Sequence, residues 1–157
     1  MCRHPRRGIT VQTDTPLLLL STFQNFFPGQ KPSHTVQAPG YETWAAGALT
    51  DDSRLTLACA EMGGRAVFTW QTARRGETLT HRPLPVWAQL SAAVLVKLCA
   101  EGLDVPGLSV ALVGERATSP RFAYGLAAAV AALLHTFHER PYTDDGIVKL
   151  IDAAKRG

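Results

Sequence analysis

The sequence has few cysteines and no long apolar run. Its three cysteines, Cys2, Cys59 and Cys99, are odd in number, lie far apart and form no Cys-x-x-Cys pair. This pattern favours a reducing compartment, in which Cys59 and Cys99 are small core residues; a bridge between those two is the alternative. No stretch is long enough to cross a bilayer. We therefore expect a cytoplasmic protein with no membrane partner.

The sequence also has only a small excess of charge of one sign. The net charge is +3, and much of it comes from Arg3, Arg6 and Arg7. No stripe of lysines and arginines with interleaved aromatic residues is present. The small excess of basic residues therefore indicates solubility and argues against a nucleic-acid partner. The apolar run at residues 17–20 is too short for a signal peptide.

What is present is typical of an ordinary globular domain. Hydrophobic residues make up 46% of the chain and charged residues 18%, and the 8% of aromatic residues argues for a packed core and against disorder. A chain of this length buries roughly 70% of its unfolded surface as one domain and is too short for two. We expect a single domain over residues 1–157, with flexibility at residues 1–13.

The pattern of apolar and breaking residues predicts a leading helix, then strands, then helices that alternate with one more strand. Pro16 begins the first helix, which runs to about Phe27. Strands are predicted at residues 34–38, 55–60, 65–71 and 108–113, with a further edge strand at 77–81. Later helices are predicted at residues 85–101, at 122–138, and from a cap at Thr143 onward. This order indicates an α+β layer fold.

Histidines and arginines give weaker indications of a site. His135 and His138, with Glu139 beside them, lack a third convergent ligand, and histidines also suit a helix C-terminus, so we assign no metal. The segment 74–76, Arg-Arg-Gly, is typical of a solvated turn; an acidic or phosphate-bearing partner is the alternative.

Residues 119–131 follow the pattern of a phosphate-binding loop and helix start, but with little of its chemistry. Such segments present backbone N–H groups through glycines and place hydroxyls in the first turn of the helix. Here Gly125 remains, and Ala127–Ala129 stand where such hydroxyls would be useful. Tight packing of the helix against a sheet is the simpler explanation of these alanines. Phe122 and Tyr124 would also crowd a nucleotide.

Two segments resemble the galactokinase branch of the GHMP small-molecule kinases. Residues 119–131 are similar to that family's nucleotide loop, Pro-x-Gly-x-Gly-Leu-Ser-Ser-Ser-Ala, with one extra residue. Residues 38–52 are similar, with one inserted residue, to its first motif, Ala-Pro-Gly-Arg-Val-Asn-Leu-Ile-Gly-Glu-His-Thr-Asp-Tyr-Asn-Gly-Gly. The residues that agree are Ala38, Pro39, Gly40, Gly47, Thr50 and Asp51. With the order of the predicted elements, the resemblance spans most of residues 15–140.

The resemblance also implies that reactive positions of the family are replaced here. Tyr41 stands at the place of the family's arginine, which helps to activate the sugar hydroxyl and to stabilise transferred charge. Ala48 and Leu49 replace the Glu-His pair that reads the sugar, whereas Asp51 keeps a sugar-facing identity. The family's catalytic aspartate, third motif and C-terminal domain would lie beyond residue 157. We therefore assign no catalytic residue. The ligand-binding candidates are Gly40, Asp51, Tyr124 and Gly125.

The fold implied by the resemblance is a two-layer sandwich like domain 2 of ribosomal protein S5, with a mixed sheet and helices on one face. The family uses ATP and Mg²⁺, but the motif that holds them is degenerate here, so we expect no cofactor and no metal. The leading hypothesis is a catalytically inactive binding or interaction module, with a protein partner, a homodimer or a sugar as its ligand. One alternative is half of a split GHMP-type sugar kinase completed by another chain. The other is an S5-like nucleic-acid-binding domain.

Overall fold

The computed structural model describes residues 17–114 and 121–156 of the chain. In chain order the elements are a helix at residues 17–26, strands β1 (His34–Gln37), β2 (Trp44–Leu49), β3 (Leu55–Cys59) and β4 (Gly64–Phe68), helices α2 (Trp70–Arg74) and α3 (Val86–Ala100), strand β5 (Leu108–Val113), and helices α4 (Phe122–Phe137) and α5 (Asp144–Arg156). The predicted helix start at Pro16 and the flexibility expected for residues 1–13 lie outside the described residues.

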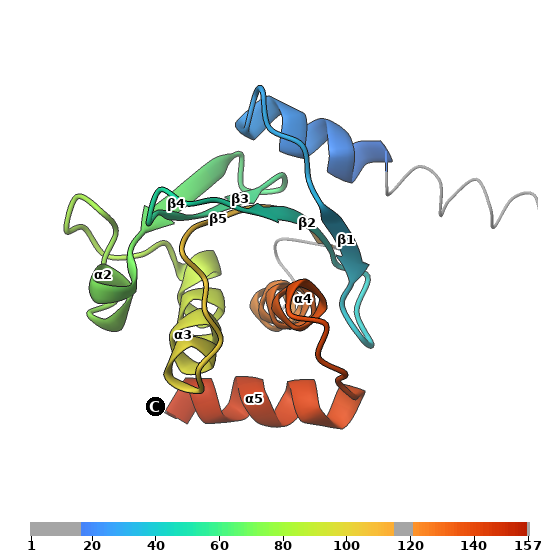
Figure 1. Ribbon diagram of the computed structural model, residues 1–157, viewed down its shortest axis with the longest axis vertical. Coiled ribbons are helices and arrows are strands. Elements are labelled where there is room, and N and C mark those ends of the chain that lie inside the picture. The colour runs from blue at the N-terminus through green and yellow to red at the C-terminus, as the bar shows by residue number, and fades with distance from the viewer. Residues whose placement is uncertain (1–16, 115–120, 157) are drawn as a thin grey trace, which may run out of the picture.

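The five strands form one mixed sheet in the order β1-β2-β5-β3-β4. Strands β3 and β5 run parallel, with Leu57 opposite Val110, whereas the other three neighbouring pairs are antiparallel. Strand β5 therefore lies in the middle, and all six of its residues are buried. Helices α3 and α4 lie against one face of the sheet, and α5 lies beyond them (Figure 1). The α+β sandwich with a mixed sheet, predicted from the sequence, is confirmed.

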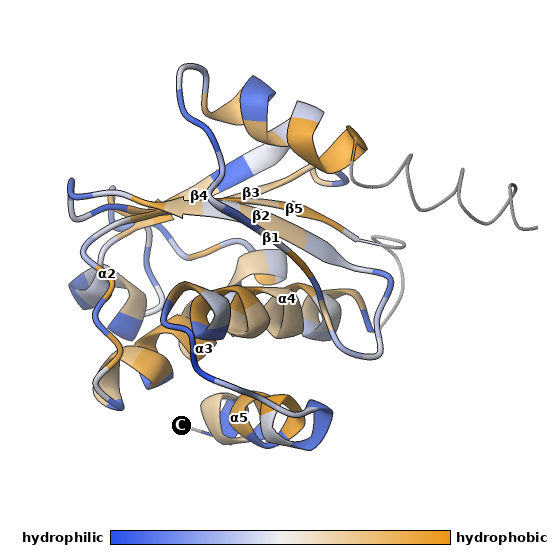
Figure 2. Ribbon diagram, turned by 45° about the vertical axis from the view of Figure 1, so that its right-hand side comes forward, coloured by the Kyte–Doolittle hydropathy of each residue, from blue (hydrophilic) through white to orange (hydrophobic). Residues whose placement is uncertain are grey.

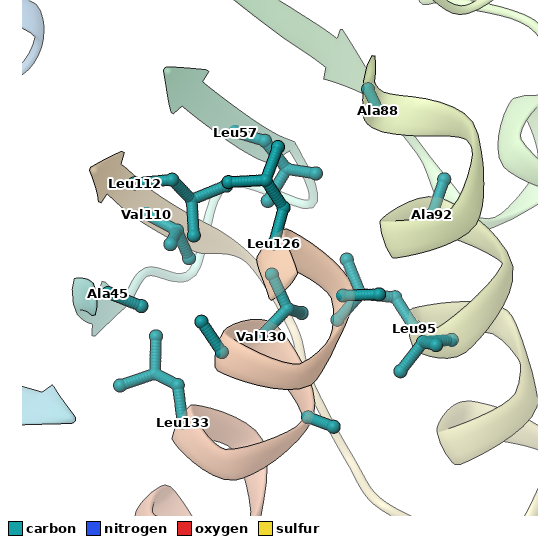
Figure 3. Packing of buried hydrophobic residues seen from close by; sticks show 14 of the residues in the cluster. Ala45, Leu57, Ala88, Ala92, Leu95, Val110, Leu112, Leu126, Val130 and Leu133 are labelled. Carbon is teal, nitrogen blue, oxygen red and sulfur yellow. The ribbon is translucent and has the colours of Figure 1, made fainter. Parts of the chain in front are cut away.

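The main core lies between the sheet and helices α3 and α4. Every residue of α4 from Gly125 to Leu134 is buried, and so are Ala88 and Ala92 of α3. Figure 3 shows Leu126 and Leu133 of α4 reaching toward the sheet. Small residues on α3 and α4 let the two backbones approach closely at the packing density of a protein interior. The tight packing of this helix against the sheet, which its alanines indicate, is confirmed.

Strand β2 was not expected from the sequence because its residues are small. The segment Trp-Ala-Ala-Gly-Ala-Leu has no β-branched residue and no alternation of apolar and polar side chains. Tertiary contacts explain this composition. A Cβ added at Gly47 would lie 2.7 Å from Leu133 Cδ2 and 3.0 Å from the Ser109 carbonyl oxygen. The glycine thus allows α4 to lie close to the sheet.

Two predictions around α2 are confirmed only in part. The strand predicted at residues 65–71 ends with β4, because Thr69 caps helix α2: its Oγ1 accepts from Thr72 N at 3.2 Å, and Thr72 Oγ1 accepts from Thr69 N at 2.9 Å. This reciprocal capping box starts a helix where the apolar pattern alone indicates a strand. The edge strand predicted at 77–81 is reduced to an isolated bridge, because the chain reverses at His81, whose φ is 65°.

The helix at residues 17–26 packs against the opposite face of the sheet (Figure 1). Its Leu19 and Phe23 are buried there together with Phe27, and the rings of the two phenylalanines lie 4.9 Å apart. The sheet residues in this cluster are Ala46, Ala58, Ala111 and Val113. Figure 2 shows that the first turn of this helix is hydrophobic on its outer side as well. The sheet therefore carries helical cover on both faces, which corrects the expectation of helices on one face alone. The larger layer is the one built by α3, α4 and α5.

Candidate functional site

The turn between β1 and β2 lies against the first turn of α4. Gly40 in this turn has a φ of 77°, a conformation that glycine adopts without strain. Gly125 lies inside α4, where a Cβ would be 2.6 Å from Thr43 Oγ1 and 3.3 Å from Tyr41 Cδ1. The missing side chain of Gly125 therefore admits the side chains of Tyr41 and Thr43. The structure brings Gly40, Tyr41 and Gly125 together in this way.

Arg121, which the motifs did not reveal, connects the two segments. Its guanidinium carbon lies 4.6 Å from the centroid of the Tyr41 ring, and its Nη2 donates a hydrogen bond to the Gly40 carbonyl at 3.0 Å. Arg121 is the N-cap of α4, where a cation opposes the helix dipole at a cost of about 0.3–1 kcal/mol. The contacts with Tyr41 and Gly40 offset that cost. An arginine placed against the helix dipole is the signal that could have identified this residue from the sequence.

A hollow of about 440 Å³, here called the Tyr41 hollow, opens beside these contacts. Its walls are Gln37, Ala38, Pro39, Gly40, Tyr41, Glu42 and Arg121. The polar groups are an amide, a carboxylate and a guanidinium, so the hollow offers both donors and acceptors of hydrogen bonds. A triphosphate placed here would face the carboxylate of Glu42 as well as the guanidinium of Arg121. This balance of charges suits a neutral polar ligand better than a polyanion.

The alanines of α4 lie on the inner side of the helix. The helix begins at Phe122, so Ala127–Ala129 lie in its second turn, and each of the three is fully buried. Hydroxyls placed there would face the packed interior rather than a ligand. The N-cap also provides no side-chain hydrogen bond to the first backbone N–H groups. The loop at residues 115–120 that leads into this helix lies outside the described residues.

Asp51 lies at the other end of strand β2 from Tyr41. Tyr41 precedes the strand and Asp51 follows it, and the six residues of β2 extend over about 17 Å. The neighbour at this end is Gly107, whose carbonyl accepts a hydrogen bond from Thr50 N at 2.9 Å. The Tyr41 hollow and Asp51 are therefore separate places in the fold.

Asp52 organises the turn that contains Asp51. Its Oδ1 accepts hydrogen bonds from Arg54 N at 3.1 Å and from Thr50 Oγ1 at 2.9 Å. These two hydrogen bonds, the backbone one first, lower the pKa of Asp52 below its ordinary value. The segment is an Asx-type turn, and Asp51 itself is exposed.

Tyr124 belongs to another surface of the molecule. Lys155 Nζ of α5 lies 3.1 Å from Tyr124 Oη and 5.1 Å from the centroid of its ring. Tyr124 and Lys155 line a groove between α3, α4 and α5. Although Tyr124 is next to Gly125 in sequence, it does not line the Tyr41 hollow.

Comparison with known proteins identifies solved structures that share this fold. No family model and no curated protein matches the chain. Among solved structures, Lactococcus lactis galactokinase complexed with galactose matches with a TM-score of 0.68 at 13% identity, over 90% of this chain and 42% of that one. The fold is that of the GHMP kinases. Methanococcus jannaschii mevalonate kinase (TM-score 0.57, 9% identity) and a second mevalonate kinase structure (TM-score 0.58, 9% identity) match over 78% of this chain and 38% and 39% of theirs.

The chain thus spans about two fifths of the length of the GHMP kinases that it matches. The expectation from the two short motifs is confirmed at the level of the fold. Over the described residues, no helix is long and apolar enough to span a membrane.

Among the residues that the structure describes, no cysteine or histidine lines the Tyr41 hollow. Cys59 and Cys99 are both free, and burial, with the Glu61 carboxylate nearby, raises the pKa of the Cys59 thiol to about 11. Within residues 17–114 and 121–156, no three His, Cys, Asp or Glu side chains converge on a possible metal site. His135 instead bonds to the backbone of its own helix, with Nδ1 2.7 Å from the Ala131 carbonyl oxygen.

Proposed function

We propose that this chain is a GHMP-kinase-like module that binds a polar ligand or a partner without transferring phosphate. The observation that carries the proposal is the contact of Tyr41 with Gly125 and Arg121. Tyr41 stands at the motif position where the resemblance implies an arginine. Its ring covers the part of α4 that a glycine would otherwise leave open to a ligand's phosphate.

The charge at this position supports the proposal. Phosphoryl transfer depends mainly on positioning and on neutralising developing charge. Loss of one group that faces such charge costs about 3–4 kcal/mol of barrier, by analogy with oxyanion donors. Arg121 brings a guanidinium to the same region, but that group is bonded to the Gly40 carbonyl and lies over the Tyr41 ring. It is held as a structural link between the β1–β2 turn and α4.

The alanines that replace the family's loop serines in α4 support the proposal as well. Ala127–Ala129 align with the three serines of the family's loop and are fully buried. An alanine side chain has no hydroxyl with which to reach Mg²⁺ or a phosphate. Without these hydroxyls and without the arginine, we expect no productive ATP–Mg complex.

A phosphotransfer assay tests the proposal. The purified chain is incubated with γ-labelled ATP, Mg²⁺ and galactose, and Lactococcus lactis galactokinase serves as the positive control. We expect no labelled hexose phosphate and no micromolar ATP–Mg binding by isothermal titration calorimetry. Labelled sugar, or nucleotide binding in the micromolar range, would contradict the proposal.

The ligand class is tested by titrating galactose against the chain. The mix of donors and acceptors in the Tyr41 hollow leads us to expect weak, millimolar binding that is lost in Glu42→Gln and in Arg121→Gln. Arg140→Gln is the matched control, because Arg140 is exposed near the opposite end of α4. Binding that is equal in all these variants would place the sugar elsewhere, and no binding would favour a protein partner.

A second candidate function is half of a split sugar kinase. It is favoured by the coverage, because the chain matches galactokinase over 90% of its own length and 42% of the other. Under this hypothesis a companion polypeptide supplies the remaining machinery, and the chain alone self-associates or exposes an apolar patch. A clean monomer that gains no activity from any co-purifying chain counts against it.

A further inference from the structure

A second cavity, of about 570 Å³, lies at the C-terminal end of α4 and is here called the His135 cavity. Its lining residues come from the end of α3, from His135 of α4 and the segment that follows α4, and from α5. Helix α5 crosses beyond α3 and α4 (Figures 1 and 2). Gly125 and His135 are ten residues apart on α4, which corresponds to about 15 Å. The His135 cavity is therefore separate from the Tyr41 hollow, and the two share no lining residue.

His135 presents an unpartnered nitrogen to this cavity. The side chain is buried, with 9% of the residue exposed, and its Nδ1 lies 2.7 Å from the Ala131 carbonyl oxygen. A carbonyl carries no hydrogen, so Nδ1 must be the donor, and Nε2 then holds the lone pair of the neutral ring. No described residue bonds Nε2. Among the described side chains, the polar atoms that are sealed from solvent and lack a hydrogen-bond partner are Ser91 Oγ and His138 Nε2. His135 Nε2 is not one of these sealed atoms. His135 Nε2 is thus an acceptor open to the cavity.

The walls around His135 are apolar and aromatic. The ring of Tyr142 lies 5.6 Å from the His135 ring, centroid to centroid, at an angle of 60°. Leu98, Leu150 and Pro141 provide further apolar surface. Two rings and aliphatic side chains around one acceptor form a slot that suits a flat molecule carrying an N–H or O–H group.

The charged groups at the rim are mainly cationic. Lys97 of α3 and Lys149 of α5 line the cavity, and Glu101 is the carboxylate among its lining residues. Asp144 and Asp145 belong to the first turn of α5 but do not line the cavity. The net charge of the lining favours an anionic group at the rim.

We propose that the His135 cavity binds a small aromatic acid that carries an N–H donor. The donor bonds to His135 Nε2, the ring contacts Tyr142 and the leucines, and the acidic group pairs with Lys97 and Lys149. The acidic group is a carboxylate or a phosphate, because either pairs with an ammonium group. The site is independent of the function proposed for the Tyr41 hollow.

Three matched probes test this proposal on the whole chain by amide and histidine-ring NMR titration. The first probe, 4-aminobenzoate, carries both the N–H donor and the acidic group. Benzoate lacks the N–H donor, and aniline lacks the acidic group. We expect 4-aminobenzoate to bind at least about fivefold more tightly than either partial probe, with shifts at Thr143, Gly146 and the His135 ring nitrogens. A parallel titration with 4-aminophenyl phosphate distinguishes the two kinds of acid.

Variants locate the site. His135→Phe keeps a ring beside Tyr142 and removes the acceptor, so 4-aminobenzoate binding should weaken about tenfold, to the level of benzoate. Lys149→Gln, at an exposed position that leaves the fold intact, should weaken 4-aminobenzoate and leave aniline unchanged. Lys31→Gln is the control, because Lys31 is exposed before β1. Equal binding of the three probes, unchanged binding in both cavity variants, or shifts confined to the Tyr41 hollow would each overturn the proposal.

Discussion

At the scale of the residue, Gly125 links the turn that carries Tyr41 to helix α4. A Cβ at this position would lie 2.6 Å from Thr43 Oγ1, and Thr43 is a buried, β-branched side chain whose rotamer is restricted. We expect Gly125→Ala to destabilise the fold by about 1–2 kcal/mol, because overpacking exceeds the gain in helix propensity. Urea unfolding monitored by circular dichroism measures this change.

Two variants show whether the clash is the cause. Gly64→Ala is the control, because the nearest atom to its added Cβ is the Met62 carbonyl oxygen at 3.9 Å. It should change stability by no more than about 0.5 kcal/mol. In the double variant Gly125→Ala/Thr43→Ala the clashing oxygen is gone, so the loss should be smaller than the sum of the two single losses. Strict additivity would show that Thr43 is not the obstacle.

Cys59 gives a prediction for pH dependence. Its side chain is fully buried, and burial raises the pKa of its thiol from 9.0 to about 11. Between these values the unfolded chain has lost the proton and the folded chain has kept it, so stability falls as pH rises through this window and is unaffected below it. The loss relative to Cys59→Ala should reach about 2–3 kcal/mol by pH 11, at about 1.4 kcal/mol per pKa unit.

The measurement is urea unfolding of both proteins at pH 8, 9, 10 and 11, and the difference between them removes the contribution of the tyrosines. Peptide mapping after alkylation at pH 8 gives an independent check. There Cys99, which is partly exposed, should react well before Cys59. Parallel pH profiles, or fast alkylation of Cys59 in the folded chain, would refute the raised pKa.

At the scale of the element, the helix at residues 17–26 owes its position to one side of its surface. Leu19 is fully buried against the sheet, whereas the neighbouring Leu18 is 51% exposed. Leu19→Ala should lower the free energy of unfolding by about 2–4 kcal/mol, and Leu18→Ala by less than about 0.5 kcal/mol. The two changes alter helix propensity equally, so their difference reports packing alone. If chemical denaturation gave equal losses, the helix would not dock on this face.

The elements that the sequence predicts are those whose own side chains carry the signal. Strand β5 is a largely apolar segment between turn residues, and α4 is followed by a proline, so both appear at the expected residues. Strand β2 escapes prediction because the reason for its small residues is the approach of Leu133, more than 80 residues away in sequence. Helix α2 escapes because a local cap at Thr69 overrides the apolar pattern.

The residues of the candidate site also fall into those that the sequence places correctly and those that it does not. The two motifs single out Gly40, Tyr41 and Gly125, and the fold places these residues side by side. Asp51 belongs to the first of these motifs but lies beyond the far end of β2, because a motif that contains a whole strand extends over the length of that strand. Arg121 lies within the loop motif but is not one of the residues that the motif specifies, and its role arises from the turn that folds against it.

At the scale of the whole molecule, the same residues build the interior and account for the missing kinase chemistry. Ala127–Ala129 lack the hydroxyls of the family's loop, and they also fill the space between α4, α3 and the sheet. Figure 3 shows Leu126, Val130 and Leu133 of α4 among the side chains of this core. Restoring the family residues would therefore place polar groups in the core rather than at a ligand.

We predict that a variant with Tyr41→Arg and serines at positions 127–129 loses stability without gaining kinase activity. Each buried hydroxyl costs about 1 kcal/mol, after partial compensation by a bond to the backbone carbonyl one turn earlier. Three of them remove a large share of a total stability of about 5–15 kcal/mol. Tyr41→Arg alone is the control, because Tyr41 is partly exposed and this variant keeps the three buried alanines. Thermal unfolding together with the labelled-ATP assay separates the outcomes. An unchanged melting temperature would contradict the predicted cost of the buried hydroxyls. Labelled sugar phosphate from the quadruple variant alone would show that positions 127–129 line a usable phosphate site.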